Sequence, residues 1–237
     1  MQRYFVDKNE NNNFIIINDD FHHIKNVMRM NDKDNIEVVY NEKLYICSIE
    51  IKEESVIASI IEELNNDYNN IEITIVQGLP KGDKFDFIIQ KATELGVTKI
   101  IPLNCNRSIV KYDKDKEKKK IDRWQKIAKE ASEQSKRITI PVIDKITDIN
   151  NLKDLDYDIK LLCSVNEKEI NIKHHLQNIK YNDKIIIVVG PEGGFTDNEE
   201  ETLIKYGFKR VSLGENILRT ETAPIFIVSV IKYELMR

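Results

Sequence analysis

Glycines are scarce in this chain of 237 residues, and three of the eight lie together in one short loop. The loop, residues 190–194, reads Gly-Pro-Glu-Gly-Gly and follows an apolar strand predicted over residues 184–189. In open α/β sheets ligands bind beyond the carboxyl ends of the strands, and glycines there let the backbone turn tightly and approach a ligand closely. We therefore expect a ligand-binding loop here, with a tight turn before a helix as the alternative.

The charge around this loop indicates which ligand it suits. Thr196 and Glu199 form a T-x-x-E capping box, so a helix begins directly after the loop. A helix N-terminus usually favours phosphate, but the acidic residues Glu192, Asp197, Glu199, Glu200 and Glu201 crowd this one. The chain also lacks the G-x-x-x-x-G-K-[ST] and G-x-G-x-x-G phosphate motifs. A neutral nucleoside, or one with a positive group, therefore suits the loop better than an anionic mononucleotide.

A second polar loop, within residues 212–223, lies between a predicted strand and the last predicted helix. Gly214 follows its strand end as Gly190 does, so we expect the two loops to form one pocket at one edge of the sheet. Arg219 and Glu221 are charged residues beside that pocket. Helix capping by Thr222 explains part of this loop, but it does not explain Arg219.

The other reactive side chains indicate no separate site. Cys47, Cys105 and Cys163 are far apart and form no C-x-x-C pair, which excludes a disulfide framework and a cysteine-based zinc site. His22-His23 and His174-His175 are adjacent pairs, and neighbours on a strand point to opposite faces, so neither pair makes a shared metal site. We therefore expect no metal, and three scattered thiols favour a reducing cytoplasm.

The net charge of −4 is distributed unevenly. Residues 1–70 hold 7 basic and 14 acidic side chains, whereas residues 71–140 hold 16 basic and 10 acidic ones. A basic middle indicates a local footprint for a polyanion, with a solvated, charged helix entrance at Lys114 to Lys120 as the alternative. No apolar run approaches the roughly 18 residues of a membrane span, so we expect a cytoplasmic protein with no membrane contact.

The elements that must hold the two loops fall into two groups. Residues 1–70 are rich in β-branched and aromatic residues, which predicts a small β-barrel. Its strands are predicted over residues 14–17, 35–40, 44–51 and 55–61, with a hairpin turn at residues 41–43. From residue 71 predicted strands and helices alternate, which indicates a mostly parallel sheet covered on both faces. The polar run at residues 65–70 separates them, so we expect domains over residues 1–70 and 71–237.

The elements predicted in the second domain include a long helix and a final apolar helix. The strands are predicted over residues 72–77, 99–103, 159–163, 184–189 and 210–213, and the helices over residues 83–95, 116–136, 197–206 and 223–235. As far as Ile231 the last helix has Ser229 as its only polar residue, and such a helix must be buried on all sides. It is either a central core element or half of a subunit interface, and we favour a homodimer.

Five motifs, in order along the chain, match one family. The motifs are LPKGDK (residues 79–84), QKATELGV (90–97), RWQKIA (123–128), GPEGGF (190–195) and LRTETA (218–223). The chain resembles the RsmE family of SPOUT methyltransferases, which methylate N3 of a uracil in 16S ribosomal RNA. The amino end is also similar, so the resemblance covers essentially the whole chain. The family usually has glycine before Asp34 and in the hairpin turn, where Lys33 and Asn41-Glu42-Lys43 stand here.

The resemblance implies an α/β protein with a PUA-like β-barrel followed by a SPOUT domain. The C-terminal trefoil knot of that domain folds S-adenosylmethionine into its loops, and the protein is a homodimer that acts on 16S rRNA of the small ribosomal subunit. A positive sulfonium without phosphate suits the acidic loop. The resemblance implies that the cofactor-binding residues are Cys163, Ser164, Gly190, Glu192, Gly193, Leu213, Gly214, Ile217, Leu218, Thr220 and Thr222.

The reaction that the resemblance implies needs no metal, but N3 of uracil carries a proton that must leave. Ionising it at neutral pH costs about 2.7 kcal/mol, at about 1.4 kcal/mol per pKa unit, which a base or a nearby cation can supply. Glu221 is the expected base, and Arg219 is expected to stabilise the uracil oxygens or to grip phosphate, although these roles could be exchanged. The residues expected to contact RNA are Arg3, Arg29, Lys81, Lys84, Arg107, Lys111, Arg123 and Arg137.

Two other functions remain open at this point. A 2′-O-ribose methyltransferase of the same superfamily would share the cofactor pocket, but the LRTETA motif favours the uracil-N3 branch. A ribosome-assembly factor would bind RNA without catalysis, and the absence of S-adenosylmethionine binding would identify it.

Overall fold

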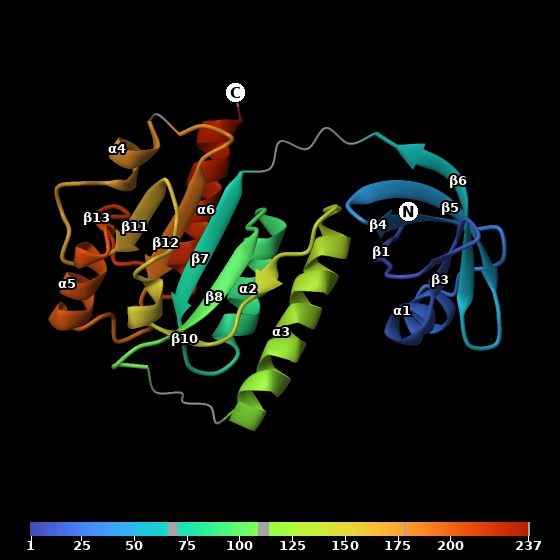
Figure 1. Cartoon of the computed structure of the whole chain (residues 1–237), viewed down its shortest axis with the longest axis horizontal. Coiled ribbons are helices and arrows are strands. Elements are labelled where there is room, and N and C mark those ends of the chain that lie inside the picture. The colour runs from blue at the N-terminus through green and yellow to red at the C-terminus, as the bar shows by residue number, and fades with distance from the viewer. Residues whose placement is uncertain (66–70, 109–113, 178, 237) are drawn as a thin grey trace. The chain divides into compact units, whose positions relative to one another are not determined.

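The computed structural model describes residues 1–65, 71–108, 114–177 and 179–236, without the side chains of residues 114 and 115. Residues 66–70 of the predicted domain boundary and Lys111 therefore lie outside the described residues. The chain divides into two compact units (Figure 1). One consists of Met1–Tyr68 with Ser132–Thr139, and the other of Asn69–Ala131 with Ile140–Arg237. No helix among the described residues is long and apolar enough to cross a membrane.

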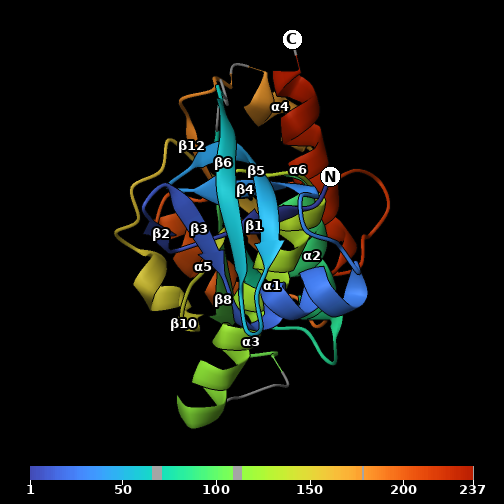
Figure 2. The ribbon, with the colours of Figure 1, turned by 90° about the vertical axis from the view of Figure 1, so that its right-hand side faces the viewer.

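The first unit is built on a curled six-stranded sheet in the order β1-β4-β5-β6-β3-β2, part of which faces the viewer in Figure 2. The pair β1 and β4 is parallel, and the other pairs are antiparallel. The elements are β1 (Arg3–Phe5), β2 (Asn9–Glu10), β3 (Asn13–Ile16), the helices α1 (Asn18–His22) and η1 (His23–Val27), β4 (Asn35–Tyr40), β5 (Lys43–Ile51) and β6 (Val56–Leu64). A register shift at Ile46/Cys47 marks a bulge in β5, and bulges bend a strand.

Two residues connect β4 to β5 in the hairpin that the sequence predicts. Asn41 and Glu42 have φ angles of 48° and 61°, which is the geometry of a type I′ turn, whose twist matches that of the strands. Lys33, which replaces the usual glycine of the family, has a φ of 73°. Both departures therefore place side chains in a left-handed conformation that glycine adopts more readily.

Residues 132–139 belong to the first unit although they follow it by more than sixty positions in the sequence. Ile138 is buried against Val39 and Leu44. The amide of Phe5 donates a hydrogen bond to the carboxylate of Glu133 at 3.3 Å. The segment includes the last residues of helix α3 (Lys114–Gln134), so no single cut in the sequence separates the two units.

The second unit is built on a parallel sheet in the order β10-β8-β7-β12-β11-β13, with β9 beside β8. Every described pair in it is parallel, as the alternating pattern predicts. Its strands are β7 (Glu72–Gly78), β8 (Lys99–Asn104), β9 (Val142–Ile143), β10 (Thr147–Asp148), β11 (Ile159–Cys163), β12 (Lys184–Val189) and β13 (Lys209–Val211). The mixed α/β class predicted for the chain is thus confirmed.

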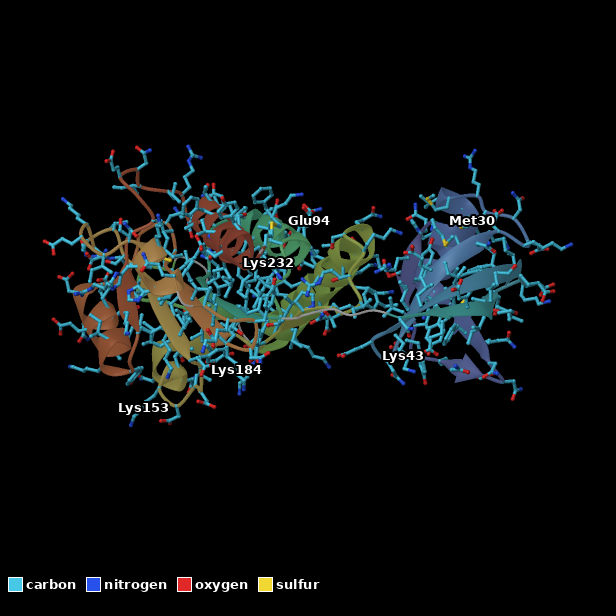
Figure 3. The ribbon with its side chains drawn as sticks, turned by 90° about the horizontal axis from the view of Figure 1, so that it is seen from above. Met30, Lys43, Glu94, Lys153, Lys184 and Lys232 are labelled. Atoms are coloured by element: carbon cyan, nitrogen blue, oxygen red, sulfur yellow. The ribbon has the colours of Figure 1, made fainter. Side chains whose placement is uncertain are left out.

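Helices cover both faces of this sheet because its strands are apolar on both sides. Ile185 and Ile187 of β12 belong to one core cluster, and Ile186 and Val188 belong to another on the opposite face. The helices on the first face are α2 (Lys84–Glu94), α3, α4 (Ile172–Leu176) and α6 (Thr222–Leu235), and those on the second are α5 (Asp197–Lys205) and η2 (Ile149–Leu152). Figure 3 shows α2 and α6 side by side, with Glu94 and Lys232 labelled.

The last helix differs from its prediction. α6 buries Ala223, Ile227 and Ile231 among other apolar residues, but Phe226 is 38% and Tyr233 74% exposed. The helix lies on the outside of the sheet layer and packs on it with one face. Within the described chain α6 is therefore not a central core element, and the other predicted option, half of a subunit interface, stays a prediction.

Candidate functional site

The carboxyl ends of the central strands lie at one edge of the parallel sheet (Figure 1). β12 lies between β7 and β11, and β13 is the outer neighbour of β11. The glycine-rich loop leaves β12 after Val189, and the second loop leaves β13 after Val211. Parallel pairing therefore starts both loops at the same edge, as the sequence predicts.

A buried hydrogen-bond cluster, formed by Gln77, Gly190 and Thr220, joins the two loops. Thr220 is 7% exposed, and its hydroxyl donates to the carbonyl oxygen of Gly190 at 2.7 Å. The side-chain nitrogen Nε2 of Gln77, near the end of β7, donates to the Thr220 hydroxyl at 3.0 Å and to the Gly190 carbonyl oxygen at 3.3 Å. We name these three residues the Thr220 clasp. It brings together the two loops that were expected to form one pocket.

Gln77 is a site residue that the sequence analysis missed. Its side chain is fully buried, and its Oε1 has no hydrogen-bond partner within the described residues. A buried polar group without a partner is costly, so such groups are usually satisfied. One feature of the sequence could have indicated Gln77. Its polar side chain follows the mostly apolar run at residues 73–76, where a side-chain amide is not needed for packing.

Close approaches and open space in the loops explain their glycines. A Cβ added to Gly78 would lie 2.5 Å from Pro191, so β7 can approach the glycine-rich loop only because this side chain is absent. Gly194 and Gly214 have φ angles of 65° and 118°, and no atom lies within 4 Å of an added Cβ at either. The backbone of both loops thus borders open space that a ligand can occupy.

The capping box predicted after the glycine-rich loop is confirmed. The Thr196 hydroxyl accepts the amide of Glu199 at 3.3 Å, and the Glu199 carboxylate accepts the amide of Thr196 at 2.8 Å. Glu199 also accepts the amide of Asn106 at 2.8 Å, and Glu200 is 4% exposed. Two of the five acidic residues near the loop are therefore buried inside the fold rather than presented to a ligand.

Lys84 lies between two carboxylates, one from each loop of the site. Its Nζ is 3.0 Å from Oε1 of Glu192 and 3.3 Å from Oε2 of Glu221. The hydrogen bond with Glu192 is the main reason that the pKa of Lys84 is raised. Burial alone would raise the pKa of Glu192, but backbone amides and Lys84 outweigh it, so this pKa is lowered. The site therefore holds Lys84 and Glu192 in their charged forms at neutral pH.

Arg219, beside this group, is exposed, and in the described part of the chain its side chain makes no hydrogen bond or ion pair. Leu213 and Leu218 pack against the apolar core, whereas Ile217 is 80% exposed. The expected cap by Thr222 is wrong. Thr222 is the first residue of α6 and no side chain caps the helix, because the carbonyl of Arg219 accepts the amide of Thr222 at 2.9 Å.

Cys163 and Ser164 stand at the end of β11, beside the two loops. Burial raises the pKa of the Cys163 thiol to about 12, so the thiol stays protonated at neutral pH. The Ser164 hydroxyl donates to Glu200 at 2.9 Å, and Glu200 also pairs with Arg210 at 2.8 Å. The Ser164 side chain is thus held inside the fold, so Ser164 can offer a ligand only its backbone atoms.

Arg107 and Arg123, two residues predicted to contact RNA, make contacts within the second unit. Nη1 of Arg107 donates to the carbonyl oxygens of Gly193 at 3.0 Å and Phe195 at 3.1 Å, so it fastens the glycine-rich loop. Arg123 forms an ion pair with Asp86. Charge alone predicts these residues as polyanion contacts, because it does not reveal their partners in the fold.

Arg3 and Arg137 are likewise engaged within the first unit. Arg3 is 5% exposed, pairs with Glu37 at 2.8 Å and donates to the carbonyl oxygen of Arg137 at 3.0 Å. Burial lowers the pKa of Arg137 to about 10. Arg29 and the side chain of Lys81 are exposed, as Arg107 and Arg123 are.

The comparisons with known proteins agree on one kind of protein. Residues 67–232 match the family described as an RNA methyltransferase domain, and residues 16–61 match an RNA methyltransferase PUA domain. The ribosomal RNA small subunit methyltransferase E of Bacillus subtilis is 38% identical over 100% of this chain and 99% of that protein. The protein of the same name from Mesomycoplasma hyopneumoniae is 37% identical over 97% of this chain and 98% of its own length.

One solved structure adds a bound molecule. It is the crystal structure of a ribosomal RNA small subunit methyltransferase E from Neisseria gonorrhoeae bound to S-adenosyl methionine. The TM-score is 0.87 at 31% identity, and the match covers 98% of this chain and 97% of that one.

Proposed function

Because the chain belongs to the family of ribosomal RNA small subunit methyltransferase E proteins, it is an S-adenosylmethionine-dependent methyltransferase of ribosomal RNA, and we propose that it methylates N3 of a uracil in 16S RNA. The observation that carries this proposal is the Thr220 clasp, which joins the two loops at the carboxyl edge of the sheet. It leaves an exposed arginine, Arg219, and a carboxylate, Glu221, immediately beside a loop that borders open space.

The residues around that space fit S-adenosylmethionine. The open backbone at Gly194 and Gly214 suits hydrogen bonds to an adenosine, and we assign a further contact with the cofactor to Glu192 of the same glycine-rich loop. We assign the apolar wall of the pocket to Leu213, Ile217 and Leu218. The remaining proposed contacts come from Cys163, Ser164, Gly190, Gly193, Thr220 and Thr222.

The chemistry follows from the proton on N3 of uracil. When bound, S-adenosylmethionine supplies an electrophilic methyl group, and its sulfur keeps the electron pair of the broken S–C bond. Glu221 accepts the N3 proton, and the electron pair of the N–H bond forms the new N–C bond. Arg219 faces the uracil oxygens and stabilises the negative charge that develops there. Both residues belong to the segment that the clasp fixes at the end of β12.

We assign RNA binding to residues 1–70 and catalysis to residues 71–237. The match of residues 16–61 to an RNA methyltransferase PUA domain supports the first assignment, and we propose that the curled sheet closes as a PUA-like barrel. In the second domain the chain leaves the outer strand β13 and returns to the end of β12, where Thr220 is clasped. This return supports the trefoil knot that the resemblance implies. A 16S RNA substrate places the reaction in the cytoplasm.

We also propose that the protein acts as a homodimer through α6. Phe226, Ser229 and Tyr233 are exposed and recur at helical spacing along one side of α6. The opposite side packs on the sheet through residues such as Ile227 and Ile231. A second copy of the chain would cover the exposed stripe.

The Arg219→Ala variant tests the proposed function. We expect methylation of unmodified small subunits to fall by about 10²- to 10³-fold, as when a group that stabilises an oxyanion is removed. The affinity for S-adenosylmethionine, measured by calorimetry, should remain that of the wild type. Lys153→Ala is the control and should remain active. Lys153 is an exposed lysine outside both loops of the site, and Figure 3 labels it.

The position of the product distinguishes the alternatives. A methyl group on N3 removes the pairing hydrogen of uracil, so reverse transcription should stop at the modified base. A methyl group mapped to a ribose 2′ oxygen would identify the other branch of the superfamily. A fully active Arg219→Ala enzyme would refute the role assigned to Arg219.

A further inference from the structure

Lys84 is the first residue of α2, a position where helix electrostatics disfavours a cation. The N-terminus of a helix carries partial positive charge, and a lysine there destabilises the helix by about 0.3–1 kcal/mol. Asp83, at the N-cap, makes no side-chain capping hydrogen bond that would offset this. Formation of α2 therefore does not account for the lysine.

The contacts of Lys84 account for it instead. Its Nζ lies 3.0 Å from Glu192 in the glycine-rich loop and 3.3 Å from Glu221 in the second loop. The backbone amide of Lys81 donates to the same oxygen of Glu192 at 3.1 Å. The ammonium group of Lys84 thereby connects the start of α2 to both loops of the site.

The charge of Lys84 affects the two carboxylates that it contacts. The Glu221 side chain is 18% exposed, so solvent screens its interaction with Lys84 less than that of a surface pair. Without Lys84, the carboxylates of Glu192 and Glu221 would be left as two like charges at one site, which raises the pKa of at least one. Arg219, two residues before Glu221, is the other charged side chain of this loop close to it, and it is exposed.

We propose that Lys84 is a positioning residue for methyl transfer, which neutralises Glu192 and holds the Glu221 carboxylate in place to accept the N3 proton. This inference rests on the proposed function, because it takes Glu221 as the base. During the reaction the N3–H proton moves to a carboxylate oxygen of Glu221, the N3 electron pair forms the bond to the methyl carbon, and the S–C electron pair remains on sulfur. Lys84 keeps its proton throughout. The raised pKa of its ammonium supports that role.

The Lys84→Met variant tests the inference. We expect kcat to fall by about 10²-fold, the effect of a misplaced catalytic group, while the KM for the small subunit stays unchanged. Because two neighbouring carboxylates hold a proton more readily once the cation between them is removed, the acid limb of the kcat profile should move to higher pH, so the loss is larger at pH 6 than at pH 8.5. Lys84→Arg keeps the charge and should restore the wild-type pH profile.

Lys91→Met is the matched control. Lys91 lies in the same helix, pairs with Glu94 at 2.8 Å and is 35% exposed, the same fraction as Lys84, but it contacts neither loop. Its kcat and pH profile should be those of the wild type. Thermal unfolding of all variants verifies that each is folded at the assay temperature. If Lys84→Met is unfolded there, the comparison of Lys84→Arg with the wild type still tests the inference.

The double variant Lys84→Met/Glu221→Gln supplies the decisive comparison. If Lys84 acts through Glu221, this variant is no slower than Glu221→Gln alone. A wild-type kcat and pH profile for Lys84→Met, with Glu221→Gln inactive, would overturn the inference and leave the proposed function standing. A weaker affinity for RNA with a salt slope smaller by about one and an intact kcat would make Lys84 a phosphate contact instead, which also overturns it. A fully active Glu221→Gln enzyme would remove the base itself and thus contradict the proposed function.

Discussion

Thr220 shows how one buried hydroxyl fixes the geometry of the site. It donates to Gly190 and accepts from Gln77, residues that stand 30 and 143 positions away in the sequence. Valine has nearly the same shape but neither donates nor accepts. Thr220→Val should therefore destabilise the protein by about 1–3 kcal/mol, the usual effect of leaving buried polar partners unsatisfied, as measured by urea unfolding.

The same variant should bind S-adenosylmethionine more weakly, because its loops are no longer held together. Calorimetry measures this affinity directly. Thr202→Val is the control, since the Thr202 hydroxyl donates to the carbonyl oxygen of Asn198, within its own helix α5, at 2.7 Å. Unchanged affinity in Thr220→Val would limit the clasp to a role in folding.

Residue types singled out candidate site residues, but they did not predict the contacts that those residues make. Arg219 and Glu221 were identifiable because charged residues in a loop between a strand and an apolar helix have no packing role. Gln77 and Lys84 acquire their roles through partners more than 100 positions away in the sequence, which only the strand order brings close. For the same reason the sequence shows that Arg107 and Arg3 are positively charged, but it does not show which carbonyl oxygens accept their hydrogen bonds.

At the scale of elements, the β4–β5 hairpin carries a testable strain. Glu42 has a φ of 61° in a type I′ turn, where Asn-Gly is the preferred pair. A left-handed residue other than glycine costs about 1–2 kcal/mol, and the extra freedom of glycine in the unfolded chain offsets about 0.5–1 kcal/mol of that. Glu42→Gly should therefore raise the free energy of unfolding by about 0.5–1 kcal/mol.

Urea unfolding of Glu42→Gly and Glu42→Ala together checks this prediction. Alanine removes the same carboxylate but keeps a Cβ, so it should not stabilise the hairpin. Equal stabilities for the two variants would show that the backbone conformation of Glu42 is not the source of the effect.

The longer elements were predictable because their apolar residues repeat with one period over several turns. α2 is observed over Lys84–Glu94 against a prediction of residues 83–95, and α5 begins at the predicted capping box. The elements missed, such as β9, β10 and η2, have two to four residues. Segments that short are too brief to show a repeating pattern of apolar residues. β9 and β10 are strands because they pair with β8, not because of the intrinsic propensity of their residues.

At the scale of the whole molecule, the return of residues 132–139 to the first unit was not predictable from the sequence. The segment follows a helix whose pattern is continuous, and nothing in its composition marks a change of unit. Its attachment depends on single contacts such as Ile138 against Leu44. The predicted division at residue 70 therefore leaves out part of the first unit, and an isolated fragment of residues 1–70 lacks part of its own packing.

The homodimer proposed through α6 leads to the last prediction. Phe226 is 38% exposed at the beginning of the exposed stripe, and burying a carboxylate there without a partner is unfavourable. Wild-type protein should elute in gel filtration with light scattering at twice the 27.7 kDa of the chain, and Phe226→Glu should elute as a monomer. Ile204→Glu, at a residue of α5 that is 39% exposed, introduces the same charge elsewhere and should remain a dimer. A wild-type mass of one chain would refute the dimer, whereas a dimeric Phe226→Glu would place its interface away from α6.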